Sequence, residues 1–165
     1  MGSLYWKKPD REAYRAIRVL TQETHGYYAR PMLSHGFTRD DIEEKIILKS
    51  FDTLRAIGIE VNAGCTVTSI DPDQGQIHVL DQGQEKTLSY DQLILATGSE
   101  AFIPPPFQPS IPMLRFVNSL DDLIGLRRLR EKAVAAGQKP SWAIIGGGLI
   151  GCEVASDMAR AGDTV

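Results

Sequence analysis

One glycine-rich turn near the end of the chain restricts the fold more than any other feature. Residues 142–145, Trp-Ala-Ile-Ile, form a short apolar run that predicts a buried parallel strand. Gly146, Gly148 and Gly151 follow with the spacing Gly-x-Gly-x-x-Gly, and residues 149–160 predict a helix. A dinucleotide pyrophosphate binds where a strand, a glycine turn and a helix follow one another in this order.

Each glycine of the turn has its own physical task. Gly146 permits the tight turn, Gly148 lets the backbone approach the phosphates, and Gly151 lets the helix pack close to the strand. The free N–H groups at the start of the helix then face the anion. The alternative is a turn that only links a strand to a helix, but the flanking elements, closed by Gly162, favour a nucleotide site. An acidic residue for the NAD ribose is expected about 20 residues further on, beyond residue 165.

Composition excludes several classes of function. The net charge of −3 provides no basic face for nucleic acid and no polybasic patch for a membrane surface. No apolar run approaches the length of a membrane span, and the N-terminus lacks the apolar core of a signal peptide. Cys65 and Cys152 form no Cys-x-x-Cys motif and have no metal-ligand spacing with the histidines. We expect both to be buried thiols in a reducing, cytoplasmic compartment.

The remaining pattern predicts an α/β fold. Thr38-x-x-Asp41 and Ser119-x-x-Asp122 have the spacing of capping boxes and predict two helix starts. The run Arg127-Arg128-x-Arg130 predicts a solvated helix face rather than an anion site. The expected elements are a strand over 16–21, a helix from 38 to about 57, a strand at 59–61, an antiparallel meander of strands at 66–70, 76–80 and 86–90, an apolar parallel strand at 92–96, and a helix from 119 to about 136.

Two of these strands end beside residues that suit a nucleotide. Glu23 follows the first strand, where such folds hold an adenosine ribose, although a solvated loop charge is the simpler interpretation of Glu23 taken alone. Gly98 follows the strand at 92–96 and allows a close backbone approach. The proline-rich stretch 103–109 predicts a surface connection with a domain boundary soon after it.

Four ordered motifs give the chain a family resemblance. They are Tyr28-Ala29-Arg30-Pro31-Met32-Leu33-Ser34, Val67-Thr68-Ser69-Ile70-Asp71-Pro72, Leu95-Ala96-Thr97-Gly98 and the turn from Gly146 to Glu153. With these motifs, residues 16–165 resemble the pyridine nucleotide–disulfide oxidoreductases, flavoproteins with two dinucleotide-binding domains. Within that superfamily, residues 28–34 are similar to the flavin-facing loop of rubredoxin reductases and ferredoxin reductases.

The resemblance implies an FAD site spread over the first two thirds of the chain. Glu23 would hold the adenosine ribose, and Arg30 with Pro31 would lie by the flavin and its phosphates. Val67 would contact adenine through its backbone. The residues near the FAD pyrophosphate would be Ala96, Thr97 and Gly98.

The resemblance also implies an NAD(P)H site and an electron path. Glu153 would lie near the nicotinamide. Hydride would pass from nicotinamide to flavin, and single electrons from flavin to a small carrier protein of the rubredoxin or ferredoxin type. The residues that would hold NAD(P)H are Gly146, Gly148, Leu149, Ile150 and Gly151.

The resemblance is incomplete, so we expect an incomplete two-domain fold truncated at both ends. Residues 1–108 would be a partial FAD-binding domain without its first strand, glycine motif and helix, and residues 109–165 would begin the NAD(P)-binding domain. The loop 30–37 contains no cysteine, which argues against a dithiol relay in that loop. Strands near Val19 and Ile94 would then lack a partner between them, unless residues 142–145 take that place.

This polypeptide alone is therefore expected to bind FAD poorly and not to oxidise NAD(P)H. The favoured hypothesis is a fragment of a flavoprotein oxidoreductase. The alternative is a non-catalytic nucleotide-binding or interaction module that keeps only the unit 142–165. A purely structural remnant is the third possibility, and it predicts no thermal stabilisation by nucleotides.

Overall fold

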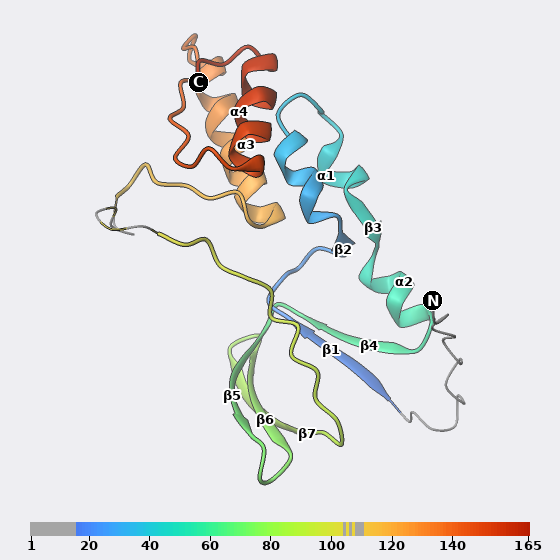
Figure 1. The fold of residues 1–165 in the computed structure, drawn as a ribbon. Helices are drawn as coiled ribbons and strands as arrows, with labels where there is room; N and C mark the ends of the chain where they lie inside the picture. Colours follow the sequence, from blue (N-terminus) through green and yellow to red (C-terminus); the bar gives the residue numbers. More distant parts are fainter. Residues whose placement is uncertain (1–15, 104, 106, 108–110) are drawn as a thin grey trace, which may run out of the picture. The chain divides into compact units, whose positions relative to one another are not determined.

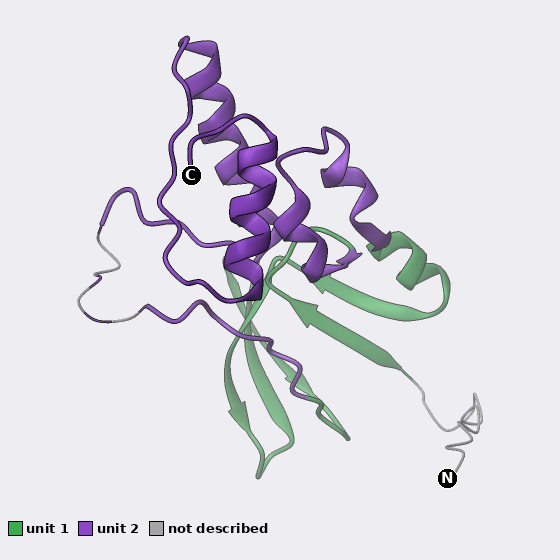
Figure 2. Ribbon diagram, turned by 45° about the horizontal axis from the view of Figure 1, so that its top comes forward, with its two compact units in different colours: residues 1–26, 49–94 green, residues 27–48, 95–165 purple. Residues whose placement is uncertain are grey.

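The computed structural model describes residues 16–103, 105, 107 and 111–165, which form two compact units. Unit 1 contains the described residues up to Gly26 together with residues 49–94, and unit 2 contains residues 27–48 together with the described residues from 95 to 165 (Figure 2). The expected domain boundary at 108–109 lies outside the described residues. The division into an FAD-binding and an NAD(P)-binding domain therefore stays a prediction.

Unit 1 begins with a parallel strand pair. Strand β1 (Ile17–Thr21) pairs with β4 (Ile59–Ala63), with Ile17 opposite Ile59 and Val19 opposite Val61. The short helix α2 (Phe51–Ala56) precedes β4. The strands predicted at 16–21 and 59–61 are confirmed, and their parallel pairing is typical of an α/β fold.

The rest of unit 1 is a three-stranded antiparallel meander, as predicted (Figure 1). Its strands are β5 (Cys65–Asp71), β6 (Gln76–Asp81) and β7 (Gln84–Ser89). Ile77 and Val79 on β6 are buried with Cys65 on β5, because alternate residues of a strand point to the same face. Leu20 of β1 packs against this cluster and joins the parallel pair to the meander.

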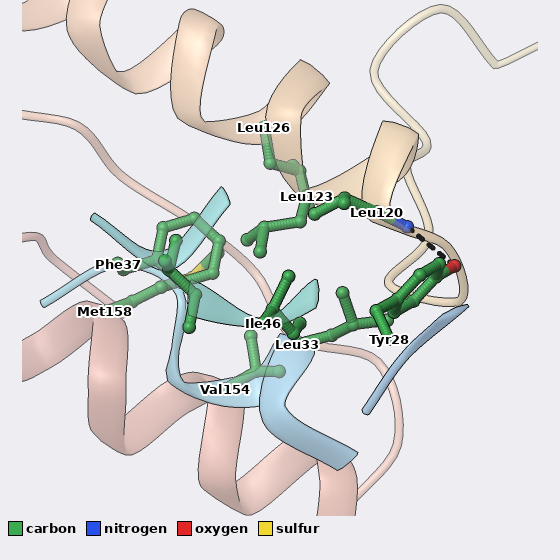
Figure 3. Close-up of a cluster of buried hydrophobic side chains, with 10 residues drawn as sticks. Tyr28, Leu33, Phe37, Ile46, Leu120, Leu123, Leu126, Val154 and Met158 are labelled. Atoms are coloured by element: carbon green, nitrogen blue, oxygen red, sulfur yellow. Dashed lines mark hydrogen bonds between the residues drawn. The ribbon is translucent and has the colours of Figure 1, made fainter. Parts of the chain in front are cut away.

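Unit 2 is mainly helical and contains a ten-residue hydrophobic core (Figure 3). Its elements are β2 (Tyr27–Tyr28), the 3₁₀ helix η1 (Arg30–His35), α1 (Ile42–Lys45), β3 (Ile47–Lys49, whose last residue belongs to unit 1), α3 (Leu120–Ala135) and α4 (Leu149–Arg160). Leu123 of α3 and Met158 of α4 are 0% and 2% exposed, so the two long helices share the core with η1 and α1. The Tyr28 hydroxyl accepts a hydrogen bond from the Leu120 N–H at 3.1 Å and fastens β2 to the start of α3 (Figure 3).

The predicted single helix from 38 to 57 is wrong. The segment instead contains α1, the strand β3 paired with β2, and α2, which begins after Ser50. Ile47, the first residue of β3, is β-branched and suits an extended backbone, and the Ser50 hydroxyl caps α2 by accepting from the Thr53 N–H at 3.1 Å. Thr38 does not cap a helix, because its hydroxyl donates to Asp157.

The two predicted apolar parallel strands, 92–96 and 142–145, are also wrong for this structure. Neither segment is a strand, and Ile94 and Ile145 are 87% and 59% exposed. A parallel strand forms only where neighbouring strands pair with its backbone, and among the described residues neither segment has a strand paired along it; one backbone contact reaches the second segment, from the Trp142 N–H to the Thr164 carbonyl at 2.9 Å. Beside the second segment there is a single parallel bridge, between Ser141 and Thr164. Ile145 is in no strand pair among the described residues, so the pairing expected for it is not seen.

Both long helices form where the sequence predicted them. The Ser119 hydroxyl and the Asp122 carboxylate make a reciprocal capping box at the start of α3. Gly137 and Gly162 follow the ends of α3 and α4 with φ of +71° and +92°, a conformation that glycine adopts without strain. No described helix combines the length and the apolar character needed to cross a bilayer.

Two side-chain predictions on these helices are wrong. Arg127 and Arg130 do not form a solvated face, because Arg127 donates to the carbonyls of Gly36 and Arg39 and Arg130 donates to the Asp163 carboxylate. Cys152 is exposed instead of buried, whereas Cys65 is buried as predicted. The arginine contacts come from tertiary partners that sequence spacing does not reveal.

Candidate functional site

The glycine turn before α4 has an open backbone at its helix end. Gly146 has φ of +114°, a value that a residue with a side chain rarely adopts. Gly148 is the N-cap of α4 in an extended conformation and gives no side-chain cap, and the first helical hydrogen bond in this turn runs from the Cys152 N–H to the Gly148 carbonyl at 3.0 Å. The N–H groups that precede Cys152 in the first turn have no acceptor within the helix. They can receive an anion.

The glycines of the turn differ in how much room there is for an added Cβ atom. A Cβ atom on Gly151 would collide with the carbonyl oxygen of Gly146, so the third glycine is required for the helix to approach the turn. Atoms added at Gly147 or Gly148 would meet nothing within 4 Å. The turn is therefore closed on the protein side and open on the outer side, which fits a dinucleotide pyrophosphate. Leu149 and Ile150 flank this open side and are 78% and 63% exposed.

Asn118 brings two of the candidate FAD segments together. Arg30 donates to the Asn118 carbonyl, and the Asn118 side-chain amide donates to the Ser99 carbonyl at 2.7 Å. The Arg30 guanidinium also lies 5.3 Å from the centre of the Tyr28 ring, within the range of a cation–π contact. Residue 99 directly follows Ala96, Thr97 and Gly98, which are exposed and irregular. The structure thus connects Arg30 with the end of the Ala-Thr-Gly motif.

Ser34 brings Pro31 and Glu153 together. The Ser34 hydroxyl lies 2.7 Å from Oε2 of Glu153 and 3.0 Å from the carbonyl oxygen of Pro31. Ser34 is 3% exposed, and Glu153 is half-buried on the second turn of α4. Because the carboxylate is charged and the shorter contact is to it, the hydroxyl proton belongs mainly to the bond with Glu153. The proposed flavin loop and the proposed nicotinamide residue are therefore in direct contact.

Asp157 fixes the same loop one turn further along α4. Its carboxylate is 1% exposed and accepts from the Phe37 N–H at 2.8 Å, the Thr38 N–H at 3.2 Å and the Thr38 hydroxyl at 2.6 Å. A buried carboxylate is tolerated when several donors surround it, and Asp157 has three. With Ser34 and Glu153, this places η1 and its following loop rigidly along α4.

Glu23 and Val67, the other two candidate FAD residues, belong to unit 1. Glu23 follows β1 and accepts a hydrogen bond on its carbonyl from the Gly64 N–H at 3.3 Å. Val67 lies on β5 beside a register irregularity and is 41% exposed. The adenosine-binding roles of Glu23 and Val67 stay predictions.

Sequence reasoning missed three residues that organise the site: Asn118, Asp157 and the hydroxyl of Ser34. Ser34 lies inside the motif that carried the resemblance, but its partner is 119 residues away. Asp157 lies on the predicted helix, but helical spacing shows only which face of a helix a residue is on and not which distant groups its carboxylate binds. A single sequence contains no signal for such distant polar pairs, because periodicity reports the face of an element and not its partner.

Comparison with known proteins gives the site a family context. The family model for pyridine nucleotide-disulphide oxidoreductases matches residues 7–165. The chain is 32% identical over 152 residues to a nitric oxide reductase FlRd-NAD(+) reductase of Aliivibrio fischeri, covering 90% of this chain and 37% of that protein. It is 30% identical over 158 residues to a rubredoxin-NAD(+) reductase of Alcanivorax borkumensis, covering 95% of this chain and 38% of that protein.

A solved structure agrees with these relatives. NADH:rubredoxin oxidoreductase from Clostridium acetobutylicum superposes with a TM-score of 0.73 at 26% identity, over 90% of this chain and 36% of that one. The chain thus spans between 36% and 38% of the length of the relatives named here. The glycine turn, the meander and the family match together lead to one conclusion: the chain belongs to the pyridine nucleotide-disulphide oxidoreductase family.

Proposed function

We propose that this chain is the nucleotide-binding portion of a flavoprotein reductase that takes electrons from NAD(P)H through FAD to a small electron-carrier protein. The observation that supports it most is the glycine turn, where Gly151 allows the close approach and Gly148 leaves the first turn of α4 uncapped. An uncapped helix start with open space in front of it is a site for a diphosphate. The family match extends this chemistry to a reductase.

In this proposal the chain's own residues bind and orient the two coenzymes. The backbone N–H groups of Leu149 and Ile150 would bind the NAD(P)H pyrophosphate, with Glu153 near the nicotinamide. Arg30 and Pro31, tied to residue 99 by Asn118, would lie against the flavin and its phosphates. The bound coenzymes would supply hydride transfer and the conversion to single-electron steps.

The proposed electron acceptor is a rubredoxin-type or ferredoxin-type protein. Support comes from the relatives, one of which is by name a rubredoxin-NAD(+) reductase and another a nitric oxide reductase FlRd-NAD(+) reductase. The absence of cysteine between residues 30 and 37 also favours direct transfer from flavin over a dithiol relay in that loop. We further propose a cytosolic location, because Cys65 and Cys152 are both free thiols.

The second candidate is a nucleotide-binding module without redox activity. It is favoured by one observation: Ala96, Thr97 and Gly98 follow a segment that forms no strand, with Ile94 and Leu95 87% and 66% exposed. An FAD pyrophosphate would then have no ordered strand end to rest on. The two candidates differ in FAD binding. An active reductase that contains this chain must bind FAD, whereas the redox-inactive module does not need FAD.

The direct test is calorimetric titration of the protein with NADH and with NADPH. Wild type is expected to bind one of them with a Kd in the micromolar to millimolar range, about 10⁻⁶ to 10⁻³ M. Gly148→Val, whose side chain would occupy the open space in front of the turn, is expected to weaken binding at least about tenfold while lowering the Tm by no more than about 4 °C. Equal heats for wild type and G148V, or no binding by wild type, would refute the proposed site.

A further inference from the structure

The contact between Ser34 and Glu153 has a consequence for anion binding at the turn. Glu153 is the fifth residue of α4, counted from Leu149. A helical side chain leans toward the helix N-terminus and covers the turn that precedes its own Cα. An unrestrained Glu153 carboxylate therefore lies within reach of the N–H end of α4, the same end that would bind a pyrophosphate.

A carboxylate at that end of the helix would oppose a bound anion. The positive end of the helix dipole attracts either negative group, and two negative groups in the same place repel each other. The turn offers no side-chain cap of its own, because Gly148 is the N-cap. The position of the Glu153 carboxylate thus decides whether the N–H groups remain available.

The structure shows what holds this carboxylate to one side. Ser34 Oγ lies 2.7 Å from Glu153 Oε2, and Ser34 is 3% exposed. The 3₁₀ helix η1 that carries Ser34 is itself fixed to α4, because Asp157 accepts hydrogen bonds from Phe37 and Thr38 just after η1. The hydroxyl is therefore presented from a rigid, buried position and not from a mobile loop.

We propose that Ser34 is a positioning residue of the dinucleotide site: its hydroxyl keeps the Glu153 carboxylate against η1 and so leaves the N–H end of α4 free for the pyrophosphate. The proposal rests on the proposed function, and it adds that the benefit of Ser34 acts through Glu153. Ser34 touches no coenzyme in this account. Loss of its hydroxyl is harmful only while residue 153 carries a charge.

A double-mutant cycle tests the coupling. Wild type, S34A, E153Q and S34A/E153Q are titrated with the coenzyme that wild type binds, and the Tm of each is measured. S34A is expected to raise the Kd about three- to tenfold. On the E153Q background the same substitution is expected to change the Kd by less than about twofold, because a neutral amide does not compete for the site. S34T is expected to restore the wild-type Kd.

The outcomes separate this inference from the proposed function. If wild type binds the coenzyme and S34A raises the Kd by the same factor with Glu153 as with E153Q, the positioning role is overturned and the proposed binding site is not. Absence of binding by wild type would overturn both. If S34A does not fold, S34T and S34V provide the comparison, since they have nearly equal volume and differ in the hydroxyl. Equal Kd values for that pair would contradict the inference.

Discussion

The hydroxyl of Thr38 donates a hydrogen bond to the buried carboxylate of Asp157 at 2.6 Å, across 119 positions of sequence. The same carboxylate accepts from the Phe37 and Thr38 N–H groups. This one side chain therefore fixes the loop after η1 to the helix that begins at the glycine turn. Unit 2 depends on polar contacts of this kind as well as on its hydrophobic core.

Replacing Asp157 by alanine is expected to destabilise the protein by about 2–3 kcal/mol, because three donors would lose their acceptor and two of them are backbone groups. Asp157→Asn keeps one acceptor oxygen, and its loss is expected to be smaller. Urea unfolding measures both. Asp52→Ala is the matched control, since the Asp52 side chain is 91% exposed in its pair with Arg55 and its removal is expected to cost less than about 0.5 kcal/mol. Equal losses at Asp157 and Asp52 would contradict the buried anchor.

Gly151→Ala and Gly148→Ala are expected to have opposite consequences. The added methyl group of G151A would meet the Gly146 carbonyl, so the helix and turn must separate, at a cost of about 1–3 kcal/mol. The methyl group of G148A enters open space, and a change of less than about 1 kcal/mol is expected. Thermal unfolding separates the two. A G151A protein as stable as wild type would show that the turn does not pack as described.

The two thiols are expected to react at very different rates with a disulfide reagent at pH 8. Cys152 is exposed. Burial raises the pKa of the Cys65 thiol, and Asp81 raises it further, so less thiolate is present at this pH and the reagent has no access. One fast and one slow equivalent are expected in the native protein, and two fast equivalents in denaturant. Two fast equivalents without denaturant would mean that the meander core is open.

The isolated 165-residue polypeptide is expected to purify without stoichiometric FAD and without NADH oxidase activity. Its candidate pyrophosphate residues Ala96, Thr97 and Gly98 are irregular and exposed, so they offer no fixed strand end. Absorbance near the flavin bands, compared with the protein absorbance, measures the FAD content. A yellow protein with one flavin per chain would contradict this expectation and favour the reductase over the redox-inactive module.

Local signals in the sequence were sufficient to predict the elements that are stabilised by contacts between residues close in sequence. The meander, α3 with its Ser119 capping box, and α4 between its glycines follow from alternation, spacing and capping chemistry. The helix predicted from 38 to 57 is wrong because β2 pairs with β3 in the middle of that segment, which local helix signals do not reveal. Propensity and period describe one element at a time, and that pairing involves two.

Elements that depend on distant partners could not be predicted with the same success. The apolar runs at 92–96 and 142–145 have the composition of buried parallel strands, but composition does not supply the neighbouring strands that such a segment needs. The site shows the same division. The glycine turn was recognisable from its spacing, whereas the partners Ser34 and Glu153 were not, because no local pattern connects positions so far apart.

The central claim, that the glycine turn binds NAD(P)H, is tested most directly by alkylation of Cys152. This thiol lies in the first turn of α4, with Sγ 3.5 Å from the Gly147 carbonyl, so a coenzyme on the turn would cover it. At a free coenzyme concentration about ten times the wild-type Kd, labelling of Cys152 is expected to slow about tenfold in wild type and by no more than about twofold in G148V. Cys65, followed in the same digest by mass spectrometry, reports any general change in unfolding. Equal labelling rates of Cys152 with and without saturating NADH and NADPH would contradict the claim.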